Sequence, residues 1–274
     1  MDYLQISFPE QEQEKRDILI ALLSELGYES FQETDDHLFA FIPESAFDAE
    51  LLTKSLPGEI FPALHYNTGL ISERNWNKLW EQNFEPVIIA DRCRVIAPFH
   101  DKSGDYQYEI IIEPQMSFGT AHHATTALMI ELMLNLNLNN KLVLDMGCGT
   151  GILAIFAMIR KATKAWAIDN NRWAYHNTLH NLKLNRVGDV EVVEGGKEKI
   201  PKLGFDMILA NINRNVLLED IPTYIRHLKK NGHILLSGFL EHDAEAIESI
   251  CNKSGLHGIQ KLKKDEWVAE AFRK

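Results

Sequence analysis

The chain has 274 residues, of which 45% are hydrophobic and 24% charged, and its formal net charge is −11. These proportions are ordinary for a globular protein and exclude a disordered or fibrous chain. No apolar run approaches the ~20 residues that a membrane-spanning helix needs, so we expect no membrane partner. The acidic start predicts neither a signal nor a transit peptide, and three widely spaced cysteines favour neither disulfides nor a zinc site. These features predict a cytoplasmic protein without a bound metal.

The negative charge is concentrated in the first quarter of the chain. Residues 1–66 contain 14 acidic and 3 basic residues, a net charge of −11, whereas residues 67–274 contain 25 of each. One interpretation is a segment that keeps the protein soluble. The other is a docking surface for a basic partner, because complementary charge steers association. Either way, direct binding of nucleic acid by this segment is disfavoured, because the phosphates are also negative.

Residues 1–66 alternate short strands with helices. The patterns predict strands near 3–8, 28–34, 37–42 and 62–68, and helices near 10–26 and 45–56. The order βαββαβ is typical of a small α+β, ferredoxin-like domain.

Residues 67–112 are predicted to form a linker region between two domains. Ser72 is suited to cap a helix on which Trp76 and Trp80 lie one turn apart. Short strands are expected at 87–89, 93–98 and 106–112.

From residue 113 onward, strands and helices alternate regularly. Strands are predicted at 142–145, 165–169, 190–194, 206–211, 233–239, 257–263 and 267–272, and helices at 123–136, 151–161, 172–185, 214–228 and 242–254. Such alternation predicts an α/β domain over residues 113–274 with a doubly wound, seven-stranded, Rossmann-like sheet. Only a short turn separates the last two strands, so they should form an antiparallel hairpin.

The clearest chemical motif begins at Asp145 and contains Gly147, Gly149 and Gly151 at alternate positions. An apolar strand here enters a glycine turn that opens a helix, and such turns let backbone amides approach a ligand closely. A dinucleotide fingerprint needs a third glycine where Ile152 stands. The pattern D-x-G-x-G-x-G instead resembles motif I of class I S-adenosylmethionine-dependent methyltransferases.

Three further strand ends offer polar groups at the edge of the sheet where ligands gather. Asp169 ends the second strand, and its carboxylate can accept both ribose hydroxyls or can cap the next helix. The third strand ends in Glu194-Gly195-Gly196, whose backbone is expected near the adenine. Asn211 ends the fourth strand, and it can orient an attacking amine or cap the helix before Arg214.

Residues 114–126 read Pro-Gln-Met-Ser-Phe-Gly-Thr-Ala-His-His-Ala-Thr-Thr. They resemble the P-x-x-A/S-F-G-T-G-x-H-x-T-T signature of the bacterial ribosomal protein L11 methyltransferases, the PrmA-type family. The resemblance extends along most of the chain. It includes the acidic first domain, the Trp76-x-x-x-Trp80 segment, the glycine motif, Asp169, the Asn211 strand and Glu266-Trp267-Val268.

The resemblance implies methyl transfer from S-adenosylmethionine to lysine ε-amines of ribosomal protein L11, with its N-terminal amine as a further acceptor. The basic L11 protein would then be the partner of the acidic domain. Asn211 is the expected catalytic residue and no strong general base is required. The residues implied in cofactor binding are Thr126, Gly147, Asp169 and Asn211, together with Asp145, Gly149, Gly151, Phe118, Gly119 and Thr120.

The chain departs from the family pattern at Ala121, which replaces the second glycine of F-G-T-G, at Ala124, and at Asn213-Arg214-Asn215. Ala121 raises the question of whether the loop expected to fold over the cofactor is mobile. Asn213-Arg214-Asn215 raises the question of whether the family's contacts to the peptide substrate are kept. His122 and His123 are either general bases or residues that pack and hydrogen-bond within the loop. Metal ligation by them is disfavoured, because no further ligands accompany them.

Other functions remain open on the sequence. The nearest is a class I methyltransferase for another protein or a small molecule. This includes relatives of the mitochondrial lysine enzyme for an electron-transfer flavoprotein subunit, which the absent transit peptide disfavours. A glutamine methyltransferase would show N-P-P-Y where Asn211-Ile212-Asn213-Arg214 stands. A different class is a cofactor-binding module that has lost catalysis.

Overall fold

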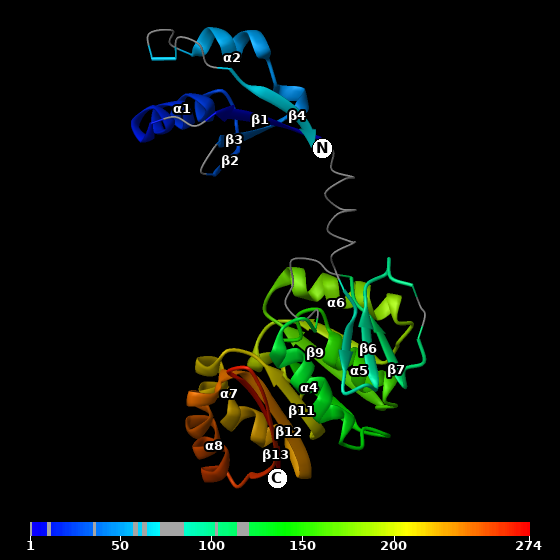
Figure 1. Cartoon of the computed structure of the whole chain (residues 1–274). Coiled ribbons are helices and arrows are strands. Elements are labelled where there is room, and N and C mark those ends of the chain that lie inside the picture. Colours follow the sequence, from blue (N-terminus) through cyan, green and yellow to red (C-terminus); the bar gives the residue numbers. More distant parts are fainter. Residues whose placement is uncertain are drawn as a thin grey trace. The chain divides into compact units, whose positions relative to one another are not determined.

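The computed structural model describes residues 2–9, 12–34, 37–56, 60–61, 65–71, 85–101, 104–113 and 121–274. The chain divides into two compact units, Met1–Phe84 and Glu85–Lys274 (Figure 1). The predicted helix with Trp76 and Trp80 and the signature residues 114–120 lie outside the described residues. Within the described ranges, no helix has the length and apolar character to cross a membrane.

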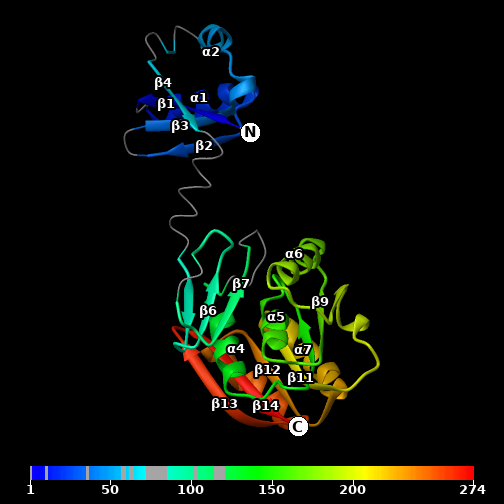
Figure 2. The same cartoon turned by 90° about the vertical axis from the view of Figure 1, so that its right-hand side faces the viewer.

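In its described residues, the first unit contains a four-stranded sheet and two α-helices (Figure 2). Its elements are β1 (Tyr3–Pro9), α1 (Gln13–Glu25), β2 (Ser30–Glu33), β3 (His37–Pro43), η1 (Glu44–Ala46), α2 (Ala49–Ser55) and β4 (Asn67–Ile71). The strand order is β2-β3-β1-β4, and each neighbouring pair is antiparallel. Ile6 lies opposite Ala40 in the register, and their face of the sheet packs on Leu19 of α1 and Leu52 of α2. Both helices therefore contribute to one core.

Two details of this unit differ from the sequence expectation. Tyr3 pairs with Ile71, so the sheet continues past residue 66, where the first domain was predicted to end. The second predicted helix is split, because the Asp48 carboxylate accepts the N–H groups of Glu50 and Leu51 and starts α2 at Ala49.

A separate three-stranded sheet precedes the main one in the second unit. It contains β5 (Val87–Ile89), β6 (Cys93–Ile96) and β7 (Tyr108–Ile111), with β5 antiparallel and β7 parallel to β6. The side-chain amide of Asn185 accepts the Ile111 N–H at 2.8 Å and donates to the Ile111 carbonyl at 2.6 Å. Residues 85–112 are thereby held on the second unit and are not a linker between the units.

The main sheet has seven strands in the order β10-β9-β8-β11-β12-β14-β13. The strands are β8 (Leu142–Met146), β9 (Lys164–Asp169), β10 (Val190–Glu194), β11 (Phe205–Asn211), β12 (Leu228–Leu240), β13 (His257–Lys264) and β14 (Trp267–Arg273). The first five strands in the sheet order are parallel, and β14 is antiparallel to both of its neighbours. The predicted parallel sheet and the predicted terminal hairpin are confirmed.

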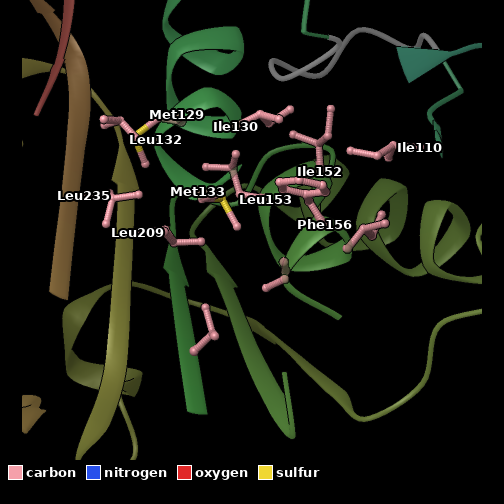
Figure 3. Packing of buried hydrophobic residues seen from close by; sticks show 14 of the residues in the cluster. Ile110, Met129, Ile130, Leu132, Met133, Ile152, Leu153, Phe156, Leu209 and Leu235 are labelled. Carbon is pink, nitrogen blue, oxygen red and sulfur yellow. The ribbon is translucent and has the colours of Figure 1, made fainter. Parts of the chain in front are cut away.

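Helices cover both faces of this sheet (Figure 1). They are α4 (Ala124–Leu134), α5 (Ile152–Ile159), α6 (Arg172–Leu184), α7 (Arg214–His227) and α8 (Ala244–Lys253), with 3-10 turns η2 (Lys197–Lys199) and η3 (Glu241–Asp243). Successive strand residues point to opposite faces. Accordingly Leu209 packs with α4 and α5, as Figure 3 shows, whereas Ile208 packs with α7 and α8. This double packing holds the carboxyl ends of β8 to β11 at one rigid edge.

Candidate active site

A cavity of about 490 Å³ opens at the carboxyl ends of the parallel strands. Its walls come from the carboxyl-terminal residues of β8, β9, β11 and β12 and from the segments that follow β8, β9, β10 and β11, with His123 and Thr125 at the start of α4 and Trp267 at the start of β14. The predicted residues Gly147, Gly149, Asp169 and Asn211, and the predicted adenine-side glycines, all line it. Segments from across the sequence therefore converge on one site.

The glycine turn forms part of the cavity floor. Gly147, Gly149 and Gly151 have φ angles of +67°, +56° and +78°, in the left-handed region that favours glycine. A side chain at Gly147 would also collide with Ile212, whose Cγ2 lies 2.2 Å from the position of an added Cβ. Gly151 does not line the cavity; it starts α5 and lies against Thr178 of α6. Its role in this structure is close helix packing.

Asp145 lies beneath the turn and not on the cavity surface. Its side chain is 1% exposed, and Oδ2 accepts the Ala154 N–H at 3.1 Å. Burial raises the pKa of Asp145 to about 7, the Ala154 N–H opposes this rise, and the nearby Asp169 charge adds to it. Its position fits a structural role in holding the turn on α5.

Asp169 is half-buried at the end of β9, and its carboxylate is oriented by two backbone groups. Oδ2 accepts the Gly149 N–H and Oδ1 accepts the Asn171 N–H, each at 2.9 Å. Asn171, and not Asp169, is the N-cap residue of α6. A carboxylate offers about four lone-pair positions, so each oxygen of Asp169 retains capacity for a hydroxyl donor.

Asn211 contacts another residue that the sequence implicated. Its Nδ2 donates to the Thr126 hydroxyl oxygen at 3.2 Å, although the two residues are 85 positions apart. Its Oδ1 is buried and has no hydrogen-bond partner within the described part of the chain. The helix-cap alternative for Asn211 is wrong, because Asn213 caps α7 by accepting the Val216 N–H. Asn211 lines the cavity, and its Oδ1 acceptor lies buried at the cavity wall.

The two signature histidines have different neighbours. His123 is the N-cap of α4, its Nδ1 lies 2.8 Å from the Thr125 hydroxyl, and its ring meets Trp267 edge-on at 4.7 Å. His122 Nε2 lies 3.0 Å from the Glu85 carbonyl. These contacts favour packing and hydrogen bonding over a role as general base. In the described ranges, no cluster of three or more His, Cys, Asp or Glu is placed to hold a metal ion.

The structure adds a group of cavity residues that the sequence did not single out: Lys197, Val216, Asp220, Tyr224 and Gly238. Gly238 has a φ angle of +92°, and a Cβ added to it would collide with the Ile212 backbone. Lys197 and Asp220 are 23 positions apart and form an ion pair of 2.6 Å. No local pattern marks such a contact, although the spacing of four between positions 216, 220 and 224 does place them on one face of a helix.

These residues fit a nucleoside cofactor. The cavity has the volume typical of small-molecule sites, and the turn brings backbone instead of side chains to its floor. Asp169 supplies charged acceptors, and Asn211 Oδ1 is a buried acceptor that lacks a donor among the described residues. Buried polar groups are normally satisfied, so this atom indicates a ligand.

The sheet order and this site define a class I α/β methyltransferase. A crystal structure of a ribosomal protein L11 methylase from Lactobacillus delbrueckii subsp. bulgaricus matches 70% of this chain and 100% of that chain, with 25% identity and a TM-score of 0.66. The model of the family Ribosomal protein L11 methyltransferase (PrmA) matches residues 5–274.

Curated relatives extend the match over nearly the full length. The ribosomal protein L11 methyltransferase of Bacteroides fragilis is 39% identical over 260 residues, 93% of each chain. That of Porphyromonas gingivalis is 41% identical over 263 residues, 93% of this chain and 90% of the relative. The chain belongs to the ribosomal protein L11 methyltransferase family.

Proposed function

We propose that this protein transfers methyl groups from S-adenosylmethionine to lysine ε-amines of ribosomal protein L11 in the cytoplasm. The observation that carries the proposal is the buried acceptor of Asn211, held by Thr126 at the end of a glycine-floored cavity. Family membership supports the choice of L11, because the matched relatives are named for it.

The cavity-lining residues and the fully buried Thr126, which does not line the cavity, contribute to cofactor binding in different ways. Gly147 and Gly149 offer backbone without side chains, and the remaining lone pairs of Asp169 accept the two ribose hydroxyls. Thr126 fixes the amide of Asn211. The bound cofactor supplies an electrophilic methyl group on a sulfonium, so the chain's own task is alignment and exclusion of water.

The acceptor amine must be neutral to act as a nucleophile. A free lysine has a pKa of ~10.4, so its neutral form costs about 4–5 kcal/mol at pH 7. Trp267 and Ile212 line the cavity with apolar surface, and removal from water lowers a lysine pKa. The Asn211 Oδ1 accepts an amine N–H and thereby directs the nitrogen lone pair. No strong general base is required.

The direct test is transfer of a radiolabelled methyl group to purified L11 protein, followed by mass mapping of the modified residues. We expect labelled lysines with the wild-type protein and a loss of at least a hundredfold in kcat with Asn211→Ala, with the Kd for cofactor changed much less. Asn213→Ala is the matched control, because Asn213 also lines the cavity but its Oδ1 already accepts the Val216 N–H as the cap of α7. Label found only on groups other than lysine ε-amines and the N-terminal amine would refute the lysine assignment. Normal turnover by Asn211→Ala would refute the role of Asn211.

We also infer that the first unit is a ferredoxin-like domain that recognises the basic substrate. Its β2-β3-β1-β4 order, with one helix between β1 and β2 and another between β3 and β4, supports the fold. Residues 1–84 carry the entire net charge of −11, which supports the recognition role.

Salt should therefore act on the protein substrate and not on the cofactor. The KM for L11 should rise with salt as attraction is screened over about 8–10 Å, while the KM for S-adenosylmethionine changes little. Removal of residues 1–84 should abolish methylation of L11 and preserve cofactor binding. If the KM for L11 does not change with salt, the acidic charge does not attract the substrate and serves solubility only.

A further inference from the structure

A charged hydrogen-bond network lines the cavity where the segment after β10 meets α7. Asp220 and Tyr224 lie four positions apart on one face of α7, and Lys197 follows β10. Lys197 Nζ donates to Asp220 Oδ1 at 2.6 Å, and the Tyr224 hydroxyl donates to Asp220 Oδ2 at 3.1 Å. Lys197 also binds Glu219. The Asp220 carboxylate is thus held from two sides.

This carboxylate retains acceptor capacity toward the cavity. Asp220 is 7% exposed and lines the cavity, and each of its oxygens accepts one of the hydrogen bonds described above. About two of the four lone-pair positions remain. The hydrogen bond to Asp220, and then that to Glu219, raises the pKa of Lys197, so the lysine stays cationic and compensates the buried charge. A donor on the ligand is the natural partner for the remaining positions.

The order of the strands places Lys197 at the β10 end of the site, and the ion pair places the Asp220 carboxylate beside Lys197. Asn211 and Trp267 lie toward one end of the row of strand ends, and Lys197 lies after β10 at the other end, with Asp169 and Gly147 between. If the ribose lies on Asp169 and the methyl group faces Asn211, as the proposed function states, the base extends toward Lys197 and Asp220.

We propose that Asp220, held by Lys197 and Tyr224, accepts a hydrogen bond from the exocyclic amine of adenine and makes the site specific for 6-amino over 6-oxo purines. This inference rests on the proposed function for the position of the cofactor. Adenine has an N–H donor at carbon 6, whereas a 6-oxo purine has an acceptor there. A carboxylate facing that acceptor leaves both unpaired, and sites with such a mismatch reject the analogue strongly.

The test is calorimetric binding of S-adenosylhomocysteine and of its 6-oxo analogue S-inosylhomocysteine to the full chain. For the wild type we expect the analogue to bind at least a hundredfold more weakly. Asp220→Asn should reduce this ratio at least tenfold, because the carboxamide can turn an N–H toward the 6-oxo oxygen. Glu219→Gln is the matched control. Glu219 also binds Lys197, but its side chain is 73% exposed and does not line the cavity, so the ratio should be unchanged.

The ratio of the two affinities distinguishes recognition of the 6-amino group from a purely structural role of Asp220. A structural defect would weaken the binding of both ligands by the same factor. Equal losses for the two ligands in Asp220→Asn would show that Asp220 only fastens α7 to η2, and would overturn the inference. Wild-type affinities within threefold of each other would overturn it without any variant. Failure of the wild type to bind S-adenosylhomocysteine at all would overturn the proposed function, and the inference with it.

Discussion

Replacement of Asp145 by asparagine should stabilise the second unit, and increasingly so as pH rises. Asp145 is 1% exposed, Oδ2 accepts the Ala154 N–H, and Oδ1 has no hydrogen-bond partner among the described residues. Burial raises its pKa from 3.8 to about 7. Asparagine keeps the shape and one acceptor oxygen but carries no charge to bury.

The size of the stabilisation by Asp145→Asn follows from the difference in Asp145 pKa between the folded and the unfolded chain. The unfolded chain loses the Asp145 proton near pH 4, whereas the folded chain keeps it until about pH 7. Between these values the folded state binds more protons, so stability falls with rising pH by ~1.4 kcal/mol per unit. The cost of burying the Asp145 charge is about 2 kcal/mol at pH 5 and about 4 to 5 kcal/mol at pH 8. The advantage of Asp145→Asn should therefore widen by about 2 to 3 kcal/mol over that range, whatever constant cost the substitution carries.

Native-state hydrogen exchange of peptides that cover β8 measures the opening free energy of this unit alone. Asp206→Asn is the control on the adjacent strand β11. Burial raises the pKa of Asp206, but the Leu142 N–H and Lys229 outweigh it and hold the pKa below its usual value. Asp206 is thus ionised in both states from pH 5 to 8, and its variant should show a constant loss of stability. A difference between Asp145→Asn and wild type that does not change with pH would refute the reasoning.

Four further outcomes are expected. Asp169→Asn should weaken S-adenosylmethionine binding at least tenfold, because hydrogen bonds to a charged acceptor are worth ~1.5–3 kcal/mol; an unchanged calorimetric Kd would exclude the ribose role. Asn213→Ala should lower the unfolding free energy by about 1 kcal/mol, the usual effect of a lost cap, with kcat retained. Gly255→Ala, at φ +81° with open space around it, should cost about 1 kcal/mol in urea unfolding. Gly238→Ala should cost clearly more, since its Cβ would lie 2.3 Å from the Ile212 carbonyl oxygen.

Local patterns were sufficient for the second unit's secondary structure and for the floor of its site. The strands from β8 to β14 were predicted within a few residues, because buried strands are continuous apolar runs and the helices between them have their own period. The glycine turn was predictable for the same local reason. Three left-handed residues at alternate positions need glycine, and Gly147, Gly149 and Gly151 all have such φ angles.

Tertiary structure decided what depends on contacts between distant segments. The sequence alone allowed Asn211 to be either a helix cap or a group that faces the ligand. In the structure Asn211 binds Thr126 and Asn213 caps α7, so Asn211 is not the cap. Likewise, residues 67–112 were predicted to be a linker region, whereas the division of the chain at Glu85 and the contact of Asn185 with Ile111 place the part from Glu85 onward on the second unit. No sequence pattern predicted the ion pair between Lys197 and Asp220. Hydrogen bonds between residues tens of positions apart have no period along the chain, and only the packed sheet and helices bring their partners within reach.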